Sequence, residues 1–221
     1  MTVFNIKVVS DTVCPWCYVG HKQLEQAIKL WYSKHPDSKD TFKVEFFPYQ
    51  LMPDFPRGPG KSIEKDTLYK QRFGAAQRQA AVERLEAIGK PLGINFRWGG
   101  NTGNTRDSHR LIELSKKYGS EVENKTVEGI FAAYFENEKD ITTYEVLGEV
   151  AKASGIPEAD FKTVIAESDE YGAQVDKAVA GARENGIQGV PDFTIQNKFQ
   201  WAGARDPDAF VSLLEKVKAS E

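Results

Sequence analysis

Residues 3–17 read VFNIKVVSDTVCPWC and contain both cysteines of this 221-residue chain, Cys14 and Cys17. The first half of the segment is rich in β-branched residues and alternates in polarity, which predicts a strand. Apolar residues at helical spacing follow, and Pro15 suits the first turn of a helix. The two thiols therefore stand at a strand-to-helix junction, where a C-x-x-C pair is a candidate redox motif.

The position of each thiol predicts its chemical role. Cys14 lies nearest the helix start, where free N–H groups and the helix dipole favour a negative charge. This matters because a thiol with a pKa of ~8.5 is only ~3% thiolate at pH 7. We therefore expect Cys14 to be the nucleophile and Cys17 to be the resolving thiol that closes the disulfide ring. Pro15 and Trp16 between them set the stiffness and polarity of the loop, and we place both in the substrate-binding set.

Two other interpretations of the cysteine pair are weaker. A structural zinc site usually needs four Cys or His ligands. His21 falls one helical turn after Cys17, but no fourth ligand is evident in the sequence, so no metal is expected. An inert pair of buried thiols is the second alternative, and the close spacing favours redox chemistry over it.

Composition excludes several classes of partner. The chain is 28% charged and 40% hydrophobic, with a net charge of −3. No basic excess indicates a nucleic acid partner, and no apolar run approaches the ~18 residues that a membrane span needs. The first residues lack the pattern of a signal peptide, so we expect a cytoplasmic protein. In that compartment thiols stay reduced and a disulfide tends to be catalytic.

Strand patterns occur at the two ends of the chain, with helical patterns between them. A second strand is expected at 41–47, a proline-rich loop at 48–60, and a hairpin of two strands at 192–196 and 199–202. Asp206-Pro207 has the signature of a helix start. The helical patterns between these parts cover 62–73, 75–89, 105–118, 121–136, 143–153, 157–167 and 169–185.

The motifs resemble those of the DsbA family. The pattern S-D-x-x-C-P-W-C-Y-x-G over 10–20 resembles the signature of its FrnE-like branch, and FPYQLMP at 47–53 and GVPxF at 189–193 continue the likeness. A βαβ unit carrying C-x-x-C and closed by a ββα unit is the thioredoxin fold. The resemblance implies an α/β protein in which residues 1–61 and 187–221 form a thioredoxin-like domain and 62–186 a large all-helical insertion domain.

The resemblance also implies a cis peptide bond before Pro191, beside the active-site cysteines. A proline at the first position of a strand does not remove a hydrogen bond that the sheet needs. A cis X-Pro bond costs only ~0.5–1 kcal/mol. The bend would turn the backbone of Val190 toward Cys14, where it could pair with an extended substrate. Asp192, which we also place in the substrate-binding set, departs from the apolar residue common at its position, and a carboxylate within ~6 Å of Cys14 would raise the pKa of that thiol.

Other polar and aromatic residues complete the expected site. Asp11 could cap the first helix, which is the commoner role, or relay a proton to Cys17 during resolution. Phe55 and Asn104 are expected to contact substrate. Arg205 and Asp206, at the start of the last helix, could hold the γ-glutamyl end of glutathione.

The leading hypothesis is therefore a thiol–disulfide oxidoreductase acting on protein or small-molecule substrates. It needs no cofactor beyond its own disulfide, with glutathione as a candidate co-substrate. The alternative is a glutathione-dependent transferase or isomerase, similar to the kappa-class transferases and 2-hydroxychromene-2-carboxylate isomerases, although those use a serine near the position of Cys14. A non-catalytic binding module is disfavoured by the intact motif. In this family the insertion contributes to a homodimer surface or to a substrate cleft, and both remain open from the sequence.

Overall fold

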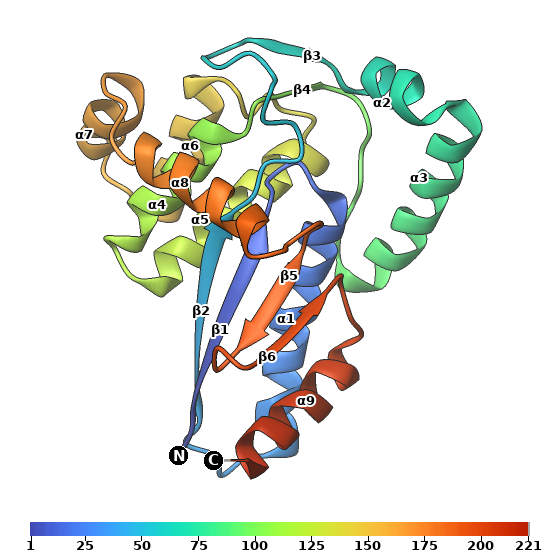
Figure 1. Cartoon of the computed structure of the whole chain (residues 1–221), viewed down its shortest axis with the longest axis vertical. Helices are drawn as coiled ribbons and strands as arrows, with labels where there is room; N and C mark the ends of the chain where they lie inside the picture. Colours follow the sequence, from blue (N-terminus) through green and yellow to red (C-terminus); the bar gives the residue numbers. More distant parts are fainter. Residues whose placement is uncertain (221) are drawn as a thin grey trace.

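A four-stranded sheet forms the centre of the computed structural model, which describes residues 1–220 (Figure 1). Its order is β2-β1-β5-β6. The strands are β1 (Val3–Ser10), β2 (Thr41–Pro48), β5 (Asp192–Ile195) and β6 (Phe199–Ala202). β1 and β2 are parallel, whereas β5 and β6 run antiparallel to their neighbours. With α1 (Pro15–Lys34) between β1 and β2 and α9 (Pro207–Ala219) after β6, the expected βαβ…ββα order is confirmed.

Helices α1 and α9 pack against one face of this sheet and against each other. Alternate residues of β1 are buried and exposed, as expected for a strand covered on one side. Phe4 packs edge-on against Trp31 of α1, with ring centroids 5.1 Å apart, and Phe193 of β5 packs edge-on against Phe210 of α9 at 5.1 Å. This aromatic core holds α1 and α9 against the sheet.

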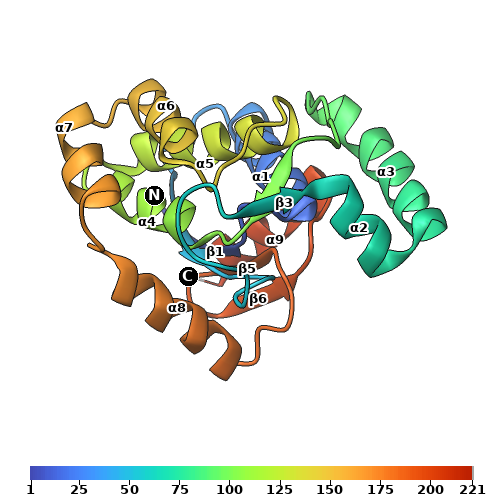
Figure 2. The ribbon, with the colours of Figure 1, turned by 90° about the horizontal axis from the view of Figure 1, so that it is seen from above.

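The chain between β2 and β5 is mainly helical. Its helices are α2 (Lys65–Phe73), α3 (Ala75–Gly89), the 3-10 turn Lys90–Leu92, α4 (Arg106–Lys116), α5 (Ser120–Phe135), α6 (Tyr144–Ser154), α7 (Glu158–Phe161) and α8 (Gly172–Glu184). α7 continues as a π-helical turn over Lys162–Ala166. Figure 2 shows α2 and α3 on one side of the molecule, apart from α4 and α6–α8 on the other. None of the helices within residues 1–220 is long and apolar enough to cross a membrane.

The expectation of an all-helical insertion was wrong at one point. β3 (Ser62–Glu64) and β4 (Asn101–Gly103) pair antiparallel in a small second sheet. The helix expected from residue 62 therefore begins at Lys65. The side chain of Glu64 accepts hydrogen bonds from the backbone N–H groups of Asp66 and Thr67, so Glu64 is the residue that starts this helix.

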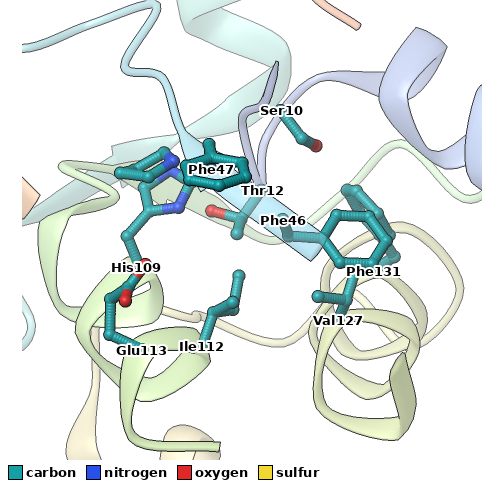
Figure 3. Close-up of a pocket in the computed structure, with 10 residues that line it drawn as sticks. Ser10, Thr12, Phe46, Phe47, His109, Ile112, Glu113, Val127 and Phe131 are labelled. Atoms are coloured by element: carbon teal, nitrogen blue, oxygen red, sulfur yellow. The ribbon is translucent and has the colours of Figure 1, made fainter. Parts of the chain in front are cut away.

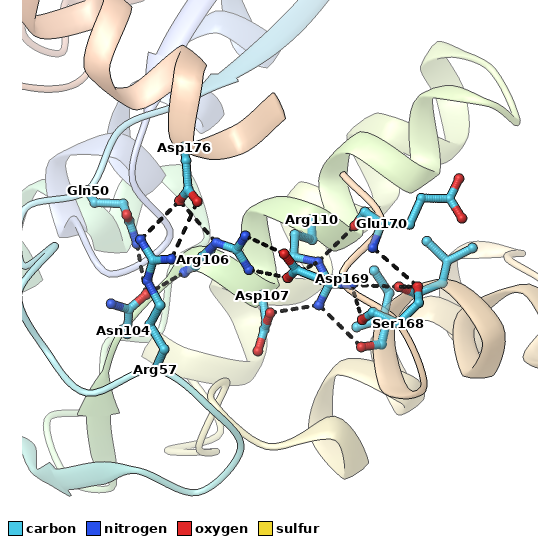
Figure 4. A network of polar contacts seen from close by, with 12 residues as sticks. Gln50, Arg57, Asn104, Arg106, Asp107, Arg110, Ser168, Asp169, Glu170 and Asp176 are labelled. Atoms are coloured by element: carbon cyan, nitrogen blue, oxygen red, sulfur yellow. Dashed lines mark hydrogen bonds and ion pairs between the residues drawn. The ribbon is translucent and has the colours of Figure 1, made fainter. Parts of the chain in front are cut away.

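A polar network connects α4 and α8 with the proline-rich loop after β2 (Figure 4). Arg106 of α4 donates through Nε to Asp176 of α8 at 3.0 Å and through Nη2 to Asp169 at 2.9 Å. Arg57 in the loop reaches the same Asp176 carboxylate at 3.1 Å. Because one carboxylate joins the loop and α4 to α8, the loop is held in place next to the cysteines. The ion pairs of this network join parts of the fold to one another.

Candidate active site

Cys14 is the N-cap residue of α1. Its backbone is extended (φ −91°, ψ 114°), and its carbonyl accepts from the N–H groups of Cys17 at 3.0 Å and Tyr18 at 3.3 Å. Pro15 begins the helix, as the sequence predicts. The Cys14 side chain makes no capping hydrogen bond, so its sulfur is available to other partners at the positive end of the helix dipole. Both cysteines are free thiols.

The partner of the Cys14 thiol comes from the other end of the chain. Cys14 Sγ lies 3.5 Å from the carbonyl oxygen of Val190. The Val190–Pro191 peptide bond is cis, as expected from the sequence. A Cβ atom added at Gly20 of α1 would lie 3.1 Å from Cγ of Pro191, so the absence of a side chain at Gly20 lets the proline approach the helix. The segment before β5 is thus packed directly against the first turns of α1.

Cys17 lies deeper than Cys14. Burial raises the pKa of the Cys17 thiol well above its ordinary value, and the hydrogen bond and charge of Cys14 act in the same direction. The Ser10 side chain and the backbone of Asp11 hydrogen-bond to Cys17 and oppose this rise. The inner thiol is therefore held protonated, which suits a resolving thiol that acts only after a mixed disulfide has formed on Cys14.

A small cavity of about 10 Å³ lies between the ends of β1 and β2 and helices α4 and α5 (Figure 3). Ser10, Thr12 and His109 bring polar groups to it, and Phe46 and Phe131 supply apolar walls. Its size is about that needed by a single water. Ser10 therefore touches both Cys17 and this cavity.

Asp11 does not cap α1, so the capping interpretation was wrong. Its carboxylate is completely buried, and Oδ2 accepts from the N–H of Leu51 at 2.7 Å. The other oxygen, Oδ1, lies 3.4 Å from Nε2 of His109, which donates to the carbonyl of Tyr49 at 2.9 Å. Oδ1 has no hydrogen-bond partner within residues 1–220. The Asp11 carboxylate accepts from the loop after β2 instead, because the buried N–H of Leu51 needs an acceptor.

The reactive thiol opens on a large apolar groove of about 490 Å³. Its walls come from the start of α1, the loop after β2, helices α2 and α3, Trp98, and the segment before the cis proline. The residues that line it are Val13, Cys14, Pro15, Trp16, Leu51, Met52, Tyr69, Arg72, Phe73, Gln77, Arg78, Ala81, Val82, Leu85, Trp98, Gly189 and Val190. The insertion thus supplies one whole wall of a cleft around Cys14.

Three residues expected to bind substrate, Pro15, Trp16 and Val190, line this groove. Its α2–α3 wall was missed by the sequence analysis. Val82 and Leu85, three positions apart, are buried in α3, and that helical spacing is the signal that could have found them. Leu51 and Met52 carried only the weaker signal of apolar residues within a proline-rich loop.

Phe55 and Asn104, also expected to bind substrate, lie outside the groove lining. Asn104 Nδ2 donates to the carbonyls of Pro53 at 3.2 Å and Phe55 at 2.8 Å, while Oδ1 accepts from Gln50 Nε2 at 2.9 Å. Asn104 therefore shapes the proline-rich loop from behind. Phe55 is half-buried against the core.

Asp192 is turned toward the neighbouring strand. Its carboxylate accepts from Nε2 of Gln200 on β6 at 3.0 Å, and burial raises its pKa. Because side chains alternate along a strand, Asp192 lies on the opposite sheet face from Phe193, which packs beside Gly20 of α1. Asp192 is absent from the groove lining.

Arg205 and Asp206, the residues considered for glutathione binding, lie at the start of α9. Asp206 caps α9 by accepting from the N–H of Asp208 at 2.9 Å, and the Arg205 guanidinium lies 5.5 Å from the ring centroid of Trp201. Gly203, just before them, donates its N–H to the carbonyl of Pro191 at 2.7 Å. The start of α9 is thus linked to the active site through the proline, but it does not line the groove.

The residues whose side chains could bind a metal ion form a cluster that does not include the cysteines. Within residues 1–220, the one group of three or more that could hold an ion is His21, Glu25 and Glu128. The ammonium of Lys22 hydrogen-bonds to the carboxylates of both Glu25, at 3.2 Å, and Glu128. Since a lysine already pairs both carboxylates, the two glutamates of this cluster belong to an ion-pair network between α1 and α5, beside the buried His21.

Comparison with known proteins agrees with this geometry. The family described as the DSBA-like thioredoxin domain matches residues 5–215, so the chain belongs to that family. The uncharacterised protein YwbO of Bacillus subtilis is 29% identical over 196 residues, 88% of each chain. A probable DsbA oxidoreductase of Streptomyces coelicolor is 25% identical and superposes with a TM-score of 0.85 over 99% of this chain and 91% of that one. The chain is therefore an oxidoreductase-like enzyme of the DsbA type.

Two more distant structures share the fold. A 2-hydroxychromene-2-carboxylate isomerase is 14% identical with a TM-score of 0.68, over 97% of this chain and 95% of that one. The cytosolic disulfide reductase DsbM of Pseudomonas aeruginosa, solved with glutathione, is 14% identical with a TM-score of 0.60, over 97% and 99% of the two chains. Both groups of relatives expected from the sequence, oxidoreductases and isomerases, are therefore found among the structural neighbours.

Proposed function

We propose that the chain is a thiol–disulfide oxidoreductase in which Cys14 attacks and Cys17 resolves. The observation that carries this proposal is the asymmetry of the two thiols. Cys14 caps α1 and opens on the groove, whereas burial raises the pKa of Cys17. A spacing of three residues at a helix start lets both sulfurs join in one disulfide ring, as C-x-x-C chemistry needs.

The reaction has two exchange steps. The Cys14 thiolate attacks one sulfur of a substrate disulfide, a Cys14–substrate mixed disulfide forms, and the other substrate sulfur leaves as a thiolate that takes a proton. Cys17 then loses its proton and attacks the Cys14 sulfur, so that the Cys14–Cys17 disulfide forms and the second substrate thiolate leaves. The substrate disulfide gains two electrons and the enzyme dithiol loses two. Run in reverse, the same steps oxidise a dithiol substrate.

We assign to Asp11 the relay of the Cys17 proton. A thiol whose pKa is raised by burial needs a nearby acceptor before it can attack. The Asp11 backbone hydrogen-bonds to Cys17, and Oδ1 of the Asp11 carboxylate is buried without a hydrogen-bond partner within residues 1–220. A buried acceptor with unused hydrogen-bonding capacity is suited to take a proton for a short time.

A glutathione-dependent transferase or isomerase is the second candidate. The observation in its favour is the hydrogen bond from Gly203 to Pro191, which places the start of α9 beside the cis proline. There Arg205 and Asp206 could bind glutathione, which would equally serve the first proposal as the reductant of the Cys14–Cys17 disulfide. The solved structure of DsbM with glutathione supports the chemistry for this fold, and its description as cytosolic supports a cytoplasmic location.

Turnover by single-cysteine variants distinguishes the two candidates. Exchange between a dithiol and a fluorescent peptide disulfide would be measured for the wild type, Cys14→Ser and Cys17→Ser, together with conjugation of glutathione to an electrophile. The proposal predicts that both variants lose catalytic disulfide exchange. Conjugation that survives in Cys17→Ser, with disulfide exchange absent from the wild type, would favour the transferase.

A further inference from the structure

We propose that the hydroxyl of Tyr69 donates a hydrogen bond to the Cys14 sulfur when that sulfur is a thiolate. This inference rests on the proposed exchange activity and adds to it a residue that acts on the reacting atom. Three features carry it: the place of Tyr69 in the groove, the long hydrogen bond that its hydroxyl makes, and the buried side chains that hold it there.

Tyr69 and Cys14 line the same groove from opposite parts of the fold. Tyr69 lies on α2, in the wall that the insertion supplies, whereas Cys14 lies at the start of α1. Burial raises the pKa of the Tyr69 hydroxyl, and the charge of Cys14 raises it further, although the hydrogen bond with Tyr134 opposes the rise. The phenol therefore stays protonated while Cys14 ionises, and in that state it can donate a hydrogen bond.

Ionisation changes what the Cys14 sulfur needs from its surroundings. As a thiol it can donate to the carbonyl oxygen of Val190 at 3.5 Å. A thiolate has no hydrogen to donate and is repelled by that oxygen, so donors stabilise it instead. The start of α1 offers few of them, because Pro15 has no N–H and the N–H of Cys17 is bonded to the Cys14 carbonyl at 3.0 Å. A side-chain donor in the groove therefore adds to what the helix start supplies.

The hydrogen of the Tyr69 hydroxyl is weakly held by its partner. Within residues 1–220 that partner is the hydroxyl of Tyr134, 3.5 Å away, whereas an O–H···O hydrogen bond is normally about 2.7–2.8 Å long. The Tyr134 hydroxyl donates its own hydrogen to Oγ1 of Thr102 at 2.8 Å, so Tyr69 is the donor of the longer bond. A donor held at this length can turn to a charged acceptor, which forms a stronger bond.

Buried side chains hold this part of α2 in place. Lys65 lies one helical turn before Tyr69 and is 1% exposed. Its Nζ donates to the carbonyl of Tyr134 at 2.9 Å and lies 3.7 Å from the centroid of the Tyr134 ring. Because Tyr134 is itself completely buried in α5, the turn of α2 that carries Tyr69 is fixed to the core of the insertion.

The test measures how readily Cys14 ionises with and without the Tyr69 hydroxyl. In a Cys17→Ser background Cys14 is the only cysteine, so its alkylation by iodoacetamide can be followed against pH without interference. Tyr69→Phe removes the hydroxyl and keeps the ring. We expect it to move the inflection of the alkylation rate up by about one pH unit, which is about 10-fold less thiolate at a pH below both inflections.

An equilibrium measurement with both cysteines intact gives a second readout. The Cys14–Cys17 disulfide takes two electrons from two glutathione thiols, which yields the enzyme dithiol and glutathione disulfide. A donor that stabilises the thiolate favours the dithiol, so Tyr69→Phe is expected to lower this equilibrium constant by about 10-fold near pH 7.

Two further variants locate the effect. Tyr32→Phe is the matched control, because it also removes one hydroxyl and one hydrogen bond, to the carbonyl of Asp40 at 2.9 Å, near the other end of α1. It should keep the parent inflection. Tyr134→Phe removes the partner that orients the Tyr69 hydroxyl, and we expect a shift in the same direction of about 3-fold or less in thiolate.

Three results would overturn this inference: an unchanged inflection in Tyr69→Phe, an equal shift in Tyr32→Phe, or a larger shift in Tyr134→Phe than in Tyr69→Phe. The last would make Tyr134 the donor. In each case the wild type still exchanges disulfides, so the proposed function stands. If the wild type exchanges neither a peptide disulfide nor glutathione disulfide, the proposed function itself fails, whereas the alkylation profiles still report on the hydrogen bond.

Discussion

The sulfur of Cys14 lies 3.5 Å from the carbonyl oxygen of Val190, although the two residues are 176 positions apart in the sequence. At this distance the Cys14 thiol can donate a weak hydrogen bond to the carbonyl. The contact joins the start of α1 to the segment before the cis proline, the two parts of the chain that carry the site. A substrate that pairs with the Val190 backbone is thereby brought next to the attacking sulfur.

The pH dependence of Cys17 follows from its burial. Burial raises the pKa of this thiol well above its ordinary value, so in the folded protein it stays protonated to a higher pH than an exposed thiol does. In Cys14→Ser, which keeps the burial, the rate of Cys17 alkylation by iodoacetamide should rise with an inflection at a clearly higher pH than in the unfolded chain. The same variant unfolded in urea provides the control, with an inflection near the ordinary value of about 8.5. Equal inflections in the two states would contradict the assignment of Cys17 as the protonated, inner thiol.

Asp11→Asn tests the proton relay. The asparagine oxygen can still accept from the N–H of Leu51, so the loop contact is retained while the basic carboxylate is lost. We expect the first exchange step to keep its rate and the resolution step to slow by about 100-fold near pH 7, with loss of its pH dependence. Stopped-flow measurement of the two leaving thiols separates the steps. If both steps slow equally, Asp11 has a structural role only.

The buried carboxyl group of Glu123, outside the candidate site, should make the free energy of unfolding depend on pH. Burial raises the pKa of its carboxyl to about 7, from an ordinary value of 4.5, and its Oε1 accepts from the N–H of Phe46 at 2.8 Å. Because the folded state binds the proton more tightly, this stabilisation is complete below about pH 4.5 and is lost as the pH rises to about 7. Relative to Glu123→Gln, the wild type should lose about 3 kcal/mol of unfolding free energy over this range. Urea unfolding at both ends of the range measures it, and a pH-independent difference would refute the prediction.

Asn104 should be required for the position of the proline-rich loop. Asn104→Ala leaves the carbonyls of Pro53 and Phe55 and the amide of Gln50 without this partner, which we expect to cost about 3 kcal/mol of unfolding free energy. The KM for peptide disulfides should rise, since the same loop carries Met52 into the groove. Asn137→Ala is the matched control, because Asn137 is exposed and makes one side-chain hydrogen bond, to Ala132. Similar urea midpoints for the two variants would show that the loop does not depend on Asn104.

The parts of the site that could be predicted are those with a local sequence signal. The cysteine spacing, Pro15 at the helix start and the strand patterns depend on neighbouring residues, and the structure places all of them as expected. The cis proline came from the resemblance to a family motif, since no local pattern distinguishes it from an ordinary trans proline before a strand.

The remaining parts depend on tertiary contacts that no local pattern encodes. The position of Asp11 would allow it to cap a helix, but its carboxylate accepts a hydrogen bond from the N–H of Leu51 in the loop instead. The proline-rich loop has no periodicity, so the sequence could not tell that Met52 faces the groove while Phe55 packs on the core. Arg72 and Arg78 are ordinary charges on polar helices until the α2–α3 pair is placed over Cys14.

A trapped mixed disulfide would identify which of the two cysteines attacks the substrate. A Cys17→Ser variant is mixed with a peptide disulfide at pH 7, quenched in acid, and mapped by mass spectrometry after digestion without reductant. We expect a stable adduct on Cys14 in most of the molecules, and in Cys14→Ser an adduct on Cys17 that forms at least about 100-fold more slowly, since burial holds that thiol protonated. Fast adduct formation on Cys17, or none on Cys14, would contradict it.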